Sequence, residues 1–291
     1  MKLITGNANV RAAARDYERY SSDLQGDADV RDYKQLPLEV DPPLHTDIRA
    51  LIAPWFTKDS LAKHEGEFTE IITALVAKAK VDGEVEVVFD LALPMIVQCL
   101  GVVFGRPQDV EEWYSWGPDT WITDEDGIRH GDHLDRYLKK TFDELDAHPT
   151  DDLFGQVNRA ELDGRPLTRL EKNGIANLVL AGGRDTVVKL VCGSLSYLAH
   201  NEMLRASLAA NRDAIPGFIT EMVRFLSPLP MMHRVDKQET TDPSNPSYVW
   251  LSFISANHDE TAIECPAEIR LDRGANPHLG FGYGRHSCIG L

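Results

Sequence analysis

The feature that most constrains the fold is an apolar helical segment of about thirty residues, from Thr168 to Asn201. Thr168 and Glu171 form a Thr-x-x-Glu capping box that marks its start. Apolar side chains then recur at helical spacing from Ile175 onward. The segment is far longer than a mean helix and is apolar on most sides, so we expect it to run through the protein interior.

The rest of the chain predicts a mainly α fold with minor β structure. Helical spacing covers residues 58–80 and 215–226, and the second of these helices ends before a proline. Stretches rich in Val, Tyr, Trp and Phe predict strands at 84–89 and 248–254. The apolar run 91–104 predicts a buried helix rather than a membrane span, because it is short. We see no repeat or linker and expect a single domain over 1–291.

The charge and the cysteines narrow the class of partner and the compartment. The chain has 291 residues and a formal net charge of −16, which argues against nucleic acid as a partner and against anionic membrane surfaces. No secretory signal is visible at the N-terminus. The four cysteines have no paired spacing, so we expect free thiols and a cytoplasmic location.

A glycine-framed cysteine stands near the end of the chain, in the segment from Phe281 to Gly290. A single cysteine is usually a small buried apolar residue. Here Gly282, Gly284 and Gly290 surround Cys288, and glycines permit positive φ and the close approach of backbone to a flat ligand. Such a loop can direct several N–H groups at one sulfur and hold it as the thiolate, which is the form that binds metal.

Phe281, Gly284, Cys288 and Gly290 fit the pattern F-x-x-G-x-x-x-C-x-G, which resembles that of the cytochrome P-450 family of haem-thiolate monooxygenases. The resemblance implies the cytochrome P-450-like fold of the soluble bacterial type. It also implies a haem b held by this loop, with Cys288 as the iron ligand. In this class the thiolate donates electron density that favours O–O cleavage.

A second motif, Ala-Gly-Gly-Arg-Asp-Thr, interrupts the long helix with residues that suit a helix interior poorly. By itself it would fit a slightly bent helix with a solvated Asp185. It also resembles the family's Ala/Gly-Gly-x-Asp/Glu-Thr pattern, which implies that Asp185 is the proton source for bound dioxygen and that Thr186 holds the relay. Gly182 and Gly183 would let a flat ligand or dioxygen approach the backbone. We expect the unusual Arg184 to point away from the haem.

Glu221 and Arg224 are spaced i, i+3 and so share one helix face. Most such pairs lie on the surface and contribute little. The resemblance implies instead a buried structural pair, which a third residue, usually Arg or His, completes. Alignment on Pro266 puts Glu268 at that third position, with Arg270 two residues later, so the identity of the third partner stays open.

The resemblance also implies cations for the two haem propionates. His45 and Arg49 lie i, i+4 on an expected helix that prolines open, and they resemble the family's His-x-x-x-Arg helix. Arg234 and His286 match the remaining propionate positions. We expect these four residues to act as a set.

The function that the resemblance implies is the insertion of one atom of dioxygen into a small hydrophobic substrate, with electrons from a separate ferredoxin-type protein. Two alternatives remain. One is a peroxide-driven haem-thiolate enzyme, against which Asp185 and Thr186 argue. The other is a truncated haem-binding remnant that is not an enzyme. The residues expected to line the pocket, which include Leu178, Ala181 and the 228–232 stretch, are apolar or small.

The two ends of the sequence bear on the alternative of a truncated haem-binding remnant. Family members have elements before the point where this sequence starts and a helix directly after the cysteine loop, whereas this sequence ends three residues past Cys288. We therefore expect a fragment of a longer protein that binds haem poorly by itself. An absent helix would remove several large buried side chains, each worth about 1.5–3 kcal/mol, from a total stability of only about 5–15 kcal/mol.

Overall fold

The structure, a computed structural model, describes residues 2–23, 32–117 and 130–290. The chain forms two compact units. The first unit comprises residues 1–30, 189–289 and 291, and the second comprises 31–188 and 290. The expected single domain stays a prediction. The mainly α character is confirmed in both units.

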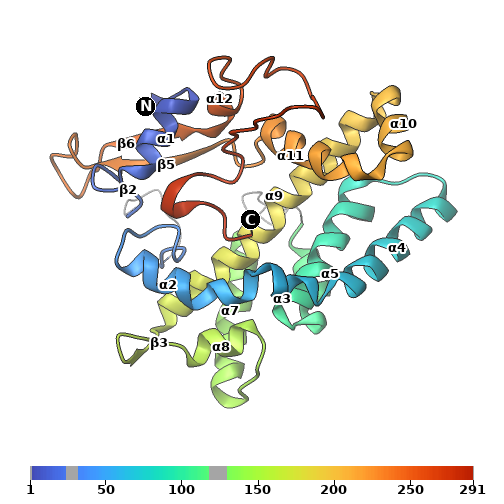
Figure 1. Cartoon of the computed structure of the whole chain (residues 1–291). Coiled ribbons are helices and arrows are strands. Elements are labelled where there is room, and N and C mark those ends of the chain that lie inside the picture. Colours follow the sequence, from blue (N-terminus) through green and yellow to red (C-terminus); the bar gives the residue numbers. More distant parts are fainter. Residues whose placement is uncertain (1, 24–31, 118–129, 291) are drawn as a thin grey trace. The chain divides into compact units, whose positions relative to one another are not determined.

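The first unit is built on a four-stranded sheet in the order β1-β6-β5-β2 (Figure 1). β1 (Lys2–Ile4) pairs parallel with β6 (Tyr248–Ser252), while β5 (Met231–Asp236) pairs antiparallel with β6 and with β2 (Tyr20–Ser21). The helices of this unit are α1 (Asn7–Arg15), α10 (Glu202–Ala210), η4 (Arg212–Ala214), α11 (Ile215–Leu226), α12 (Phe253–Asn257) and η5 (Gly284–His286). Helix α1 packs on α12 and β6 through a core that contains Val10, Leu251 and Leu279.

The second unit is almost entirely helical. Its elements are α2 (Leu44–Ile52), η1 (Ala53–Phe56), α3 (Lys58–Ala62), α4 (Glu65–Asp82), η2 (Val87–Ala92), α5 (Leu93–Phe104), η3 (Pro107–Asp109), α6 (Val110–Ser115), α7 (His130–Ala147), α8 (Leu153–Arg159) and the short hairpin β3 (Glu161–Leu162) and β4 (Arg165–Pro166). Its core contains an aromatic cluster in which Trp113 packs edge-on against Phe104 and Tyr137.

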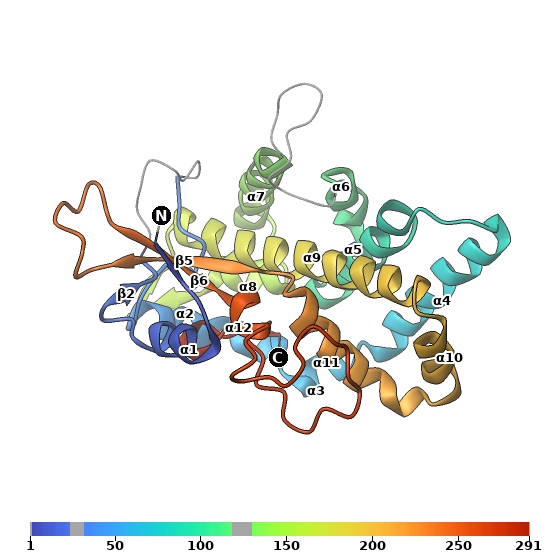
Figure 2. The same ribbon diagram turned by 90° about the horizontal axis from the view of Figure 1, so that it is seen from above.

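The long helix α9 (Arg169–Ala199) confirms the main prediction from the sequence (Figure 2). Its capping box forms, since Thr168 accepts from the Glu171 N–H and Glu171 accepts from the Thr168 N–H. Hydrogen bonds from Arg165, together with those from Thr168, lower the pKa of Glu171 to about 2. Residues 169–188 of α9 belong to the second unit and 189–199 to the first.

The shorter elements follow the sequence less closely. The helix expected at 215–226 is α11, but 58–80 contains two helices, α3 and α4. The strand expected at 84–89 is wrong. Val87 begins the π-helical turn η2, which leads directly into α5, and the Glu86 side chain caps that turn by accepting from the Phe89 N–H. Tertiary context therefore overrides the β-propensity of the Val-Val-Phe run.

The helical stretch Val87–Phe104 is apolar enough to meet the length and composition criteria for a membrane span, with a mean hydropathy of 2.2 over 18 residues. A third of this stretch is buried within the structure. Core helices of globular proteins meet the same criteria.

Candidate active site

The cysteine loop lies in the first unit and is closed by its own backbone. The Cys288 N–H donates to the Phe281 carbonyl at 2.8 Å, and the Ser287 N–H donates to the Gly284 carbonyl at 3.1 Å. Gly282 and Gly284 have φ values of +71° and +74°. A Cβ at Gly284 would also lie 2.9 Å from the Ala14 carbonyl oxygen of α1, so both conformation and space require glycine there. The Cys288 side chain is exposed, so its thiol is accessible to a ligand.

The base of the loop is anchored on the rest of the first unit. Leu279 donates its N–H to the buried Asn257 side chain, and a Cβ at Gly280 would lie 2.5 Å from a Val223 methyl of α11. Burial lowers the pKa of His278, so the ring is neutral and accepts from the Gly280 N–H at 3.2 Å. On the other side of the loop, the Tyr283 ring faces guanidinium groups of α1. The thiol is thus carried by a fixed scaffold rather than by a loose end.

Glu221 and Arg224 on α11 form the buried pair that the sequence predicts. Arg224 donates to both carboxylate oxygens, at 2.9 and 3.0 Å, and to the backbone carbonyls of Asn257, Pro266 and Glu268. The two side chains are 2% and 0% exposed, which rules out a surface salt bridge. The pair ties α11 to the irregular chain that leads to the cysteine loop.

The third partner of this network is Arg273, which the sequence did not identify. Its Nε donates to Glu221 Oε1 at 3.0 Å, and Asn276 Nδ2 donates to the same oxygen at 2.8 Å. At the aligned positions, Glu268 contributes a backbone carbonyl and Arg270 a backbone N–H. The alignment on Pro266 therefore assumed a shorter turn than the chain makes. Two arginines, Arg270 and Arg273, lie in the stretch 267–276, and the fold of the turn decides that the Arg273 side chain reaches Glu221.

These donors control the ionisation of Glu221. Burial alone would raise the pKa of its carboxyl group. Hydrogen bonds from Arg224, from the Arg270 backbone and from Arg273 outweigh burial and lower the pKa to about 2. The network is therefore a fixed anion held by two arginines.

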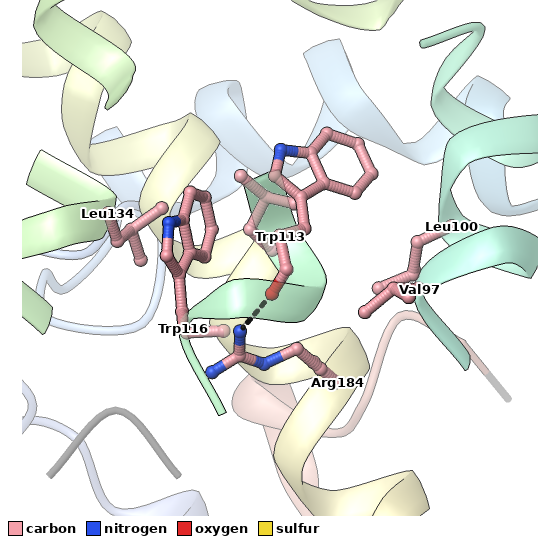
Figure 3. A pocket seen from close by; sticks show the side chains of 8 residues that line it. Val97, Leu100, Trp113, Trp116, Leu134 and Arg184 are labelled. Atoms are coloured by element: carbon pink, nitrogen blue, oxygen red, sulfur yellow. Dashed lines mark hydrogen bonds between the residues drawn. The ribbon is translucent and has the colours of Figure 1, made fainter. Parts of the chain in front are cut away.

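The acid–alcohol pair lies on α9 within the second unit. Asp185 is 8% exposed, and its Oδ1 accepts from Arg184 Nε at 3.0 Å. The Thr186 hydroxyl donates to the Gly182 carbonyl at 3.0 Å, as expected for a threonine bonding back one turn, and α9 stays helical throughout. Arg184 is 3% exposed and points toward Trp113 of α6, to whose carbonyl its Nη1 donates at 3.3 Å (Figure 3).

The two glycines of this motif differ. A Cβ at Gly183 would lie 3.1 Å from a Leu100 methyl of α5, so this glycine serves helix packing. A Cβ at Gly182 would meet no atom closer than Leu178 Cδ1 of its own helix, at 3.9 Å. Gly182 is exposed and is the position where a ligand could approach the backbone.

The four residues that are expected to bind the haem propionates lie in different units, two in each. His45, 3% exposed, and the half-buried Arg49 lie one turn apart on α2 of the second unit. Arg234, 5% exposed, lies on β5, and His286 lies in η5, both in the first unit. Within the described residues the Arg49 guanidinium has no ion-pair partner, so its charge is available to an anion. That the four residues act as one set stays a prediction.

Known proteins of similar sequence and structure identify the family. A scan against models of protein families gave no match. The cyclomarin C epoxidase CymV of Salinispora arenicola is 31% identical over 270 residues, which are 86% of this chain and 67% of the epoxidase. A solved structure described as a carbohydrate-active P-450 is 34% identical, covers 99% of this chain and 78% of its own, and superposes with a TM-score of 0.90. The chain belongs to the cytochrome P-450 family.

Other members of the family extend this result. A steroid C26-monooxygenase of Mycobacterium tuberculosis is 29% identical over 300 residues, which are 97% of this chain and 81% of that enzyme. The fold, the class of haem-dependent monooxygenases and a cysteine-ligated haem as cofactor follow from membership. Family membership thereby confirms the class of protein predicted from the cysteine loop.

The residues of this cytochrome P-450 fit such a haem. Among the described residues no three His, Cys, Asp or Glu side chains come together as a metal site. Cys288 would therefore be one protein ligand, which suits an iron whose equatorial ligands come from a macrocycle rather than from protein. The uncompensated Arg49 suits an anionic propionate.

Proposed function

We propose that Cys288 is the iron ligand of a haem-thiolate monooxygenase that inserts one oxygen atom into a small hydrophobic substrate. The observation that carries the proposal is the closed loop from Phe281 to Cys288, which presents an exposed thiol on a backbone with two positive-φ glycines. When bound, a thiolate-ligated haem supplies dioxygen activation. Phe281, Gly284 and Gly290 would form the part of the loop that lies close to the ring.

The chain's own side chains supply the protons. Each turnover consumes one dioxygen, two electrons and two protons, and one oxygen atom leaves as water. Asp185 would take a proton from the medium on its carboxylate and pass it on at the Thr186 hydroxyl, whose Oγ1 lies 3.0 Å from the Gly182 carbonyl. Gly182 leaves room beside that hydroxyl.

Cations on three elements would orient the cofactor. His45 and Arg49 on α2, Arg234 on β5 and His286 in η5 would hold the propionates by charge-assisted hydrogen bonds, which are about twice as strong as neutral ones. The positively charged Arg49 without an internal counter-charge among the described residues supports this assignment.

The partners follow from the same chemistry. The electrons would come from a separate ferredoxin-type protein, which is the electron donor that the family resemblance implies. Of the relatives named above, one is a steroid monooxygenase, which accords with an apolar substrate here, and one is a carbohydrate-active cytochrome P-450, which accords with a polar one. All four cysteines are free thiols, which suits a reducing cytoplasm.

The decisive experiment is the reduced, carbon monoxide-bound spectrum of the haem-loaded chain. We expect a Soret band at the position typical of thiolate ligation, lost in Cys288→Ala and retained in Cys265→Ala, which alters an equally exposed cysteine of the same unit. A band typical of histidine ligation that is unchanged in Cys288→Ala would overturn the assignment. Haem binding without dioxygen-dependent turnover would instead favour the non-enzyme alternative, and turnover with peroxide alone would favour the peroxide-driven one.

A further inference from the structure

Arg184 is a buried cation beside the acid of the relay. Its side chain is 3% exposed and lies against the apolar side chains of Val97, Leu100 and Leu180, around a cavity of about 10 Å³ (Figure 3). Burying an isolated charge in such surroundings is costly, so the guanidinium needs compensation. Asp185 Oδ1, 3.0 Å from Arg184 Nε, supplies it.

The same guanidinium also binds the end of another helix. Arg184 Nη1 donates to the Trp113 carbonyl, near the carboxyl end of α6 (Val110–Ser115). The last four carbonyls of a helix have no intrahelical partner and carry partial negative charge, which favours a cation there. The guanidinium carbon also lies 5.8 Å from the centroid of the Trp116 ring, which places it within reach of a cation–π contact.

We propose that Arg184 is a positioning residue for the proton relay, which fixes the Asp185 carboxylate by binding it and the carboxyl end of α6 with one rigid guanidinium. The proposal rests on the proposed role of Asp185 and adds to it a residue that the family pattern leaves unspecified at this position. Neighbouring residues of a helix normally point apart. The contact therefore requires Arg184 to fold back along α9, and the Trp113 carbonyl gives it a reason to do so.

This arrangement has a consequence for proton movement. An arginine stays charged at every accessible pH, so its guanidinium is a permanent donor to the Asp185 carboxylate. The position of that carboxylate, from which a proton would pass to the Thr186 hydroxyl, is thereby fixed. Because the guanidinium also holds α6, a displacement of α6 would change the position of the Asp185 carboxylate.

The test compares Arg184→Met, Arg184→Lys and Asp185→Asn in the haem-loaded chain. For Arg184→Met we expect product formed per reductant consumed to fall on the order of 10-fold to 100-fold, because small misplacements of a reacting group have effects of that size. Hydrogen peroxide-driven turnover, which needs no relay, should persist. Arg184→Lys keeps the charge and should restore part of the coupling, which a purely space-filling role would not predict.

A second readout does not depend on turnover. The shifts in Tm of Arg184→Met and Asp185→Asn should be non-additive in the double variant, since both changes remove the same ion pair. Additive shifts, or normal coupling in Arg184→Met beside uncoupled Asp185→Asn, would overturn the proposal while leaving the relay intact. Normal coupling in Asp185→Asn as well would refute the relay itself. Should Arg184→Met fail to fold, Arg184→Gln, which keeps a donor without the charge, replaces it.

Discussion

Two buried acid–arginine pairs, one on α11 and one on α9, are built in different ways. Glu221 accepts five hydrogen bonds, two from Arg224 on α11 itself and three from the Arg270 backbone, Arg273 and Asn276 in the stretch 270–276. Asp185 is held by the arginine directly before it, and its side chain is 12% exposed against 2% for Glu221. The Glu221 carboxylate thus ties α11 to the chain that leads to the cysteine loop, whereas the Asp185 carboxylate is bound by a guanidinium that also holds α6.

This difference accords with a structural role for the Glu221 carboxylate and a role in the reaction for the Asp185 carboxylate. The Glu221 network binds α11 to the chain segment that leads to the cysteine loop. The network therefore stabilises the base of that loop. At Asp185, the Arg184 guanidinium binds the carboxylate and also the carboxyl end of α6. The largest effects on stability should therefore come from Glu221, and the largest effects on the course of the reaction from the Asp185 region.

The strongest test of the contrast is Glu221→Gln. Breaking a buried pair leaves uncompensated arginines and should lower the free energy of unfolding by about 3–5 kcal/mol. Glu264→Gln is the matched control, because Glu264 is 81% exposed and 3.4 Å from Arg270, and exposed pairs contribute only about 0–1 kcal/mol. Chemical denaturation measures both variants. Equal losses would show that the Glu221 network is not the anchor described above.

The ionisation of Glu221 predicts how stability responds to acid. Its pKa is lowered from the ordinary 4.5 to about 2, so its contribution is present above pH 4.5 and is lost as the pH falls toward 2. We expect this loss to be roughly 1–3 kcal/mol. Glu171 has a similarly low pKa, so the informative quantity is the difference between wild type and Glu221→Gln at each pH. A difference that does not shrink between pH 5 and pH 3 would contradict the assignment.

At the other pair, Thr186→Val should alter the reaction rather than the fold. Losing one partly exposed hydrogen bond changes stability by about 1 kcal/mol or less, whereas product formed per reductant consumed should fall. Thr220→Val provides the control, because the Thr220 hydroxyl makes the same bond to the Pro216 carbonyl on α11, also at 3.0 Å. Both variants should show similar Tm values. Unaltered coupling in Thr186→Val would count against the relay.

The smallest expected effect comes from Gly182→Ala. The new methyl group has open space, and alanine is better than glycine in a helix interior by about 1 kcal/mol, so the apoprotein should gain a little stability. Carbon monoxide binding should weaken if the haem approaches this face. Gly66→Ala is the control for the effect of alanine on helix stability alone, because a Cβ at Gly66 would meet no atom within 4 Å. Carbon monoxide affinity unchanged in both variants would place the ligand elsewhere.

Local patterns of the sequence predicted much of this molecule. Helix α9 and helix α11 follow from periodicity, capping and a following proline, and the loop around Cys288 follows from its glycines. Arg273 could not be predicted, since it reaches Glu221 across a turn whose length depends on tertiary packing. The pairing of Arg184 with Asp185 was equally hidden, because it depends on a carbonyl of α6.

The same reasoning explains the wrong strand. Val87 and its neighbours favour extended structure locally, but their apolar side chains continue the helical stretch that ends at Phe104. The arrangement of Cys288, Asp185 and the four propionate cations around one haem remains a prediction that the spectra and variants above address.

The contact between α1 and the cysteine loop has a consequence for biosynthesis. Gly284 packs on the Ala14 carbonyl, and Tyr283 packs on Arg11 and Arg15, so residues about 270 positions apart must meet before the loop takes its shape. Ribosomes add about 5–20 residues per second, and α1 is made long before its partner emerges. The thiol therefore reaches its final setting only after nearly all of residues 1–291 have been translated, so haem capture by this loop follows their synthesis.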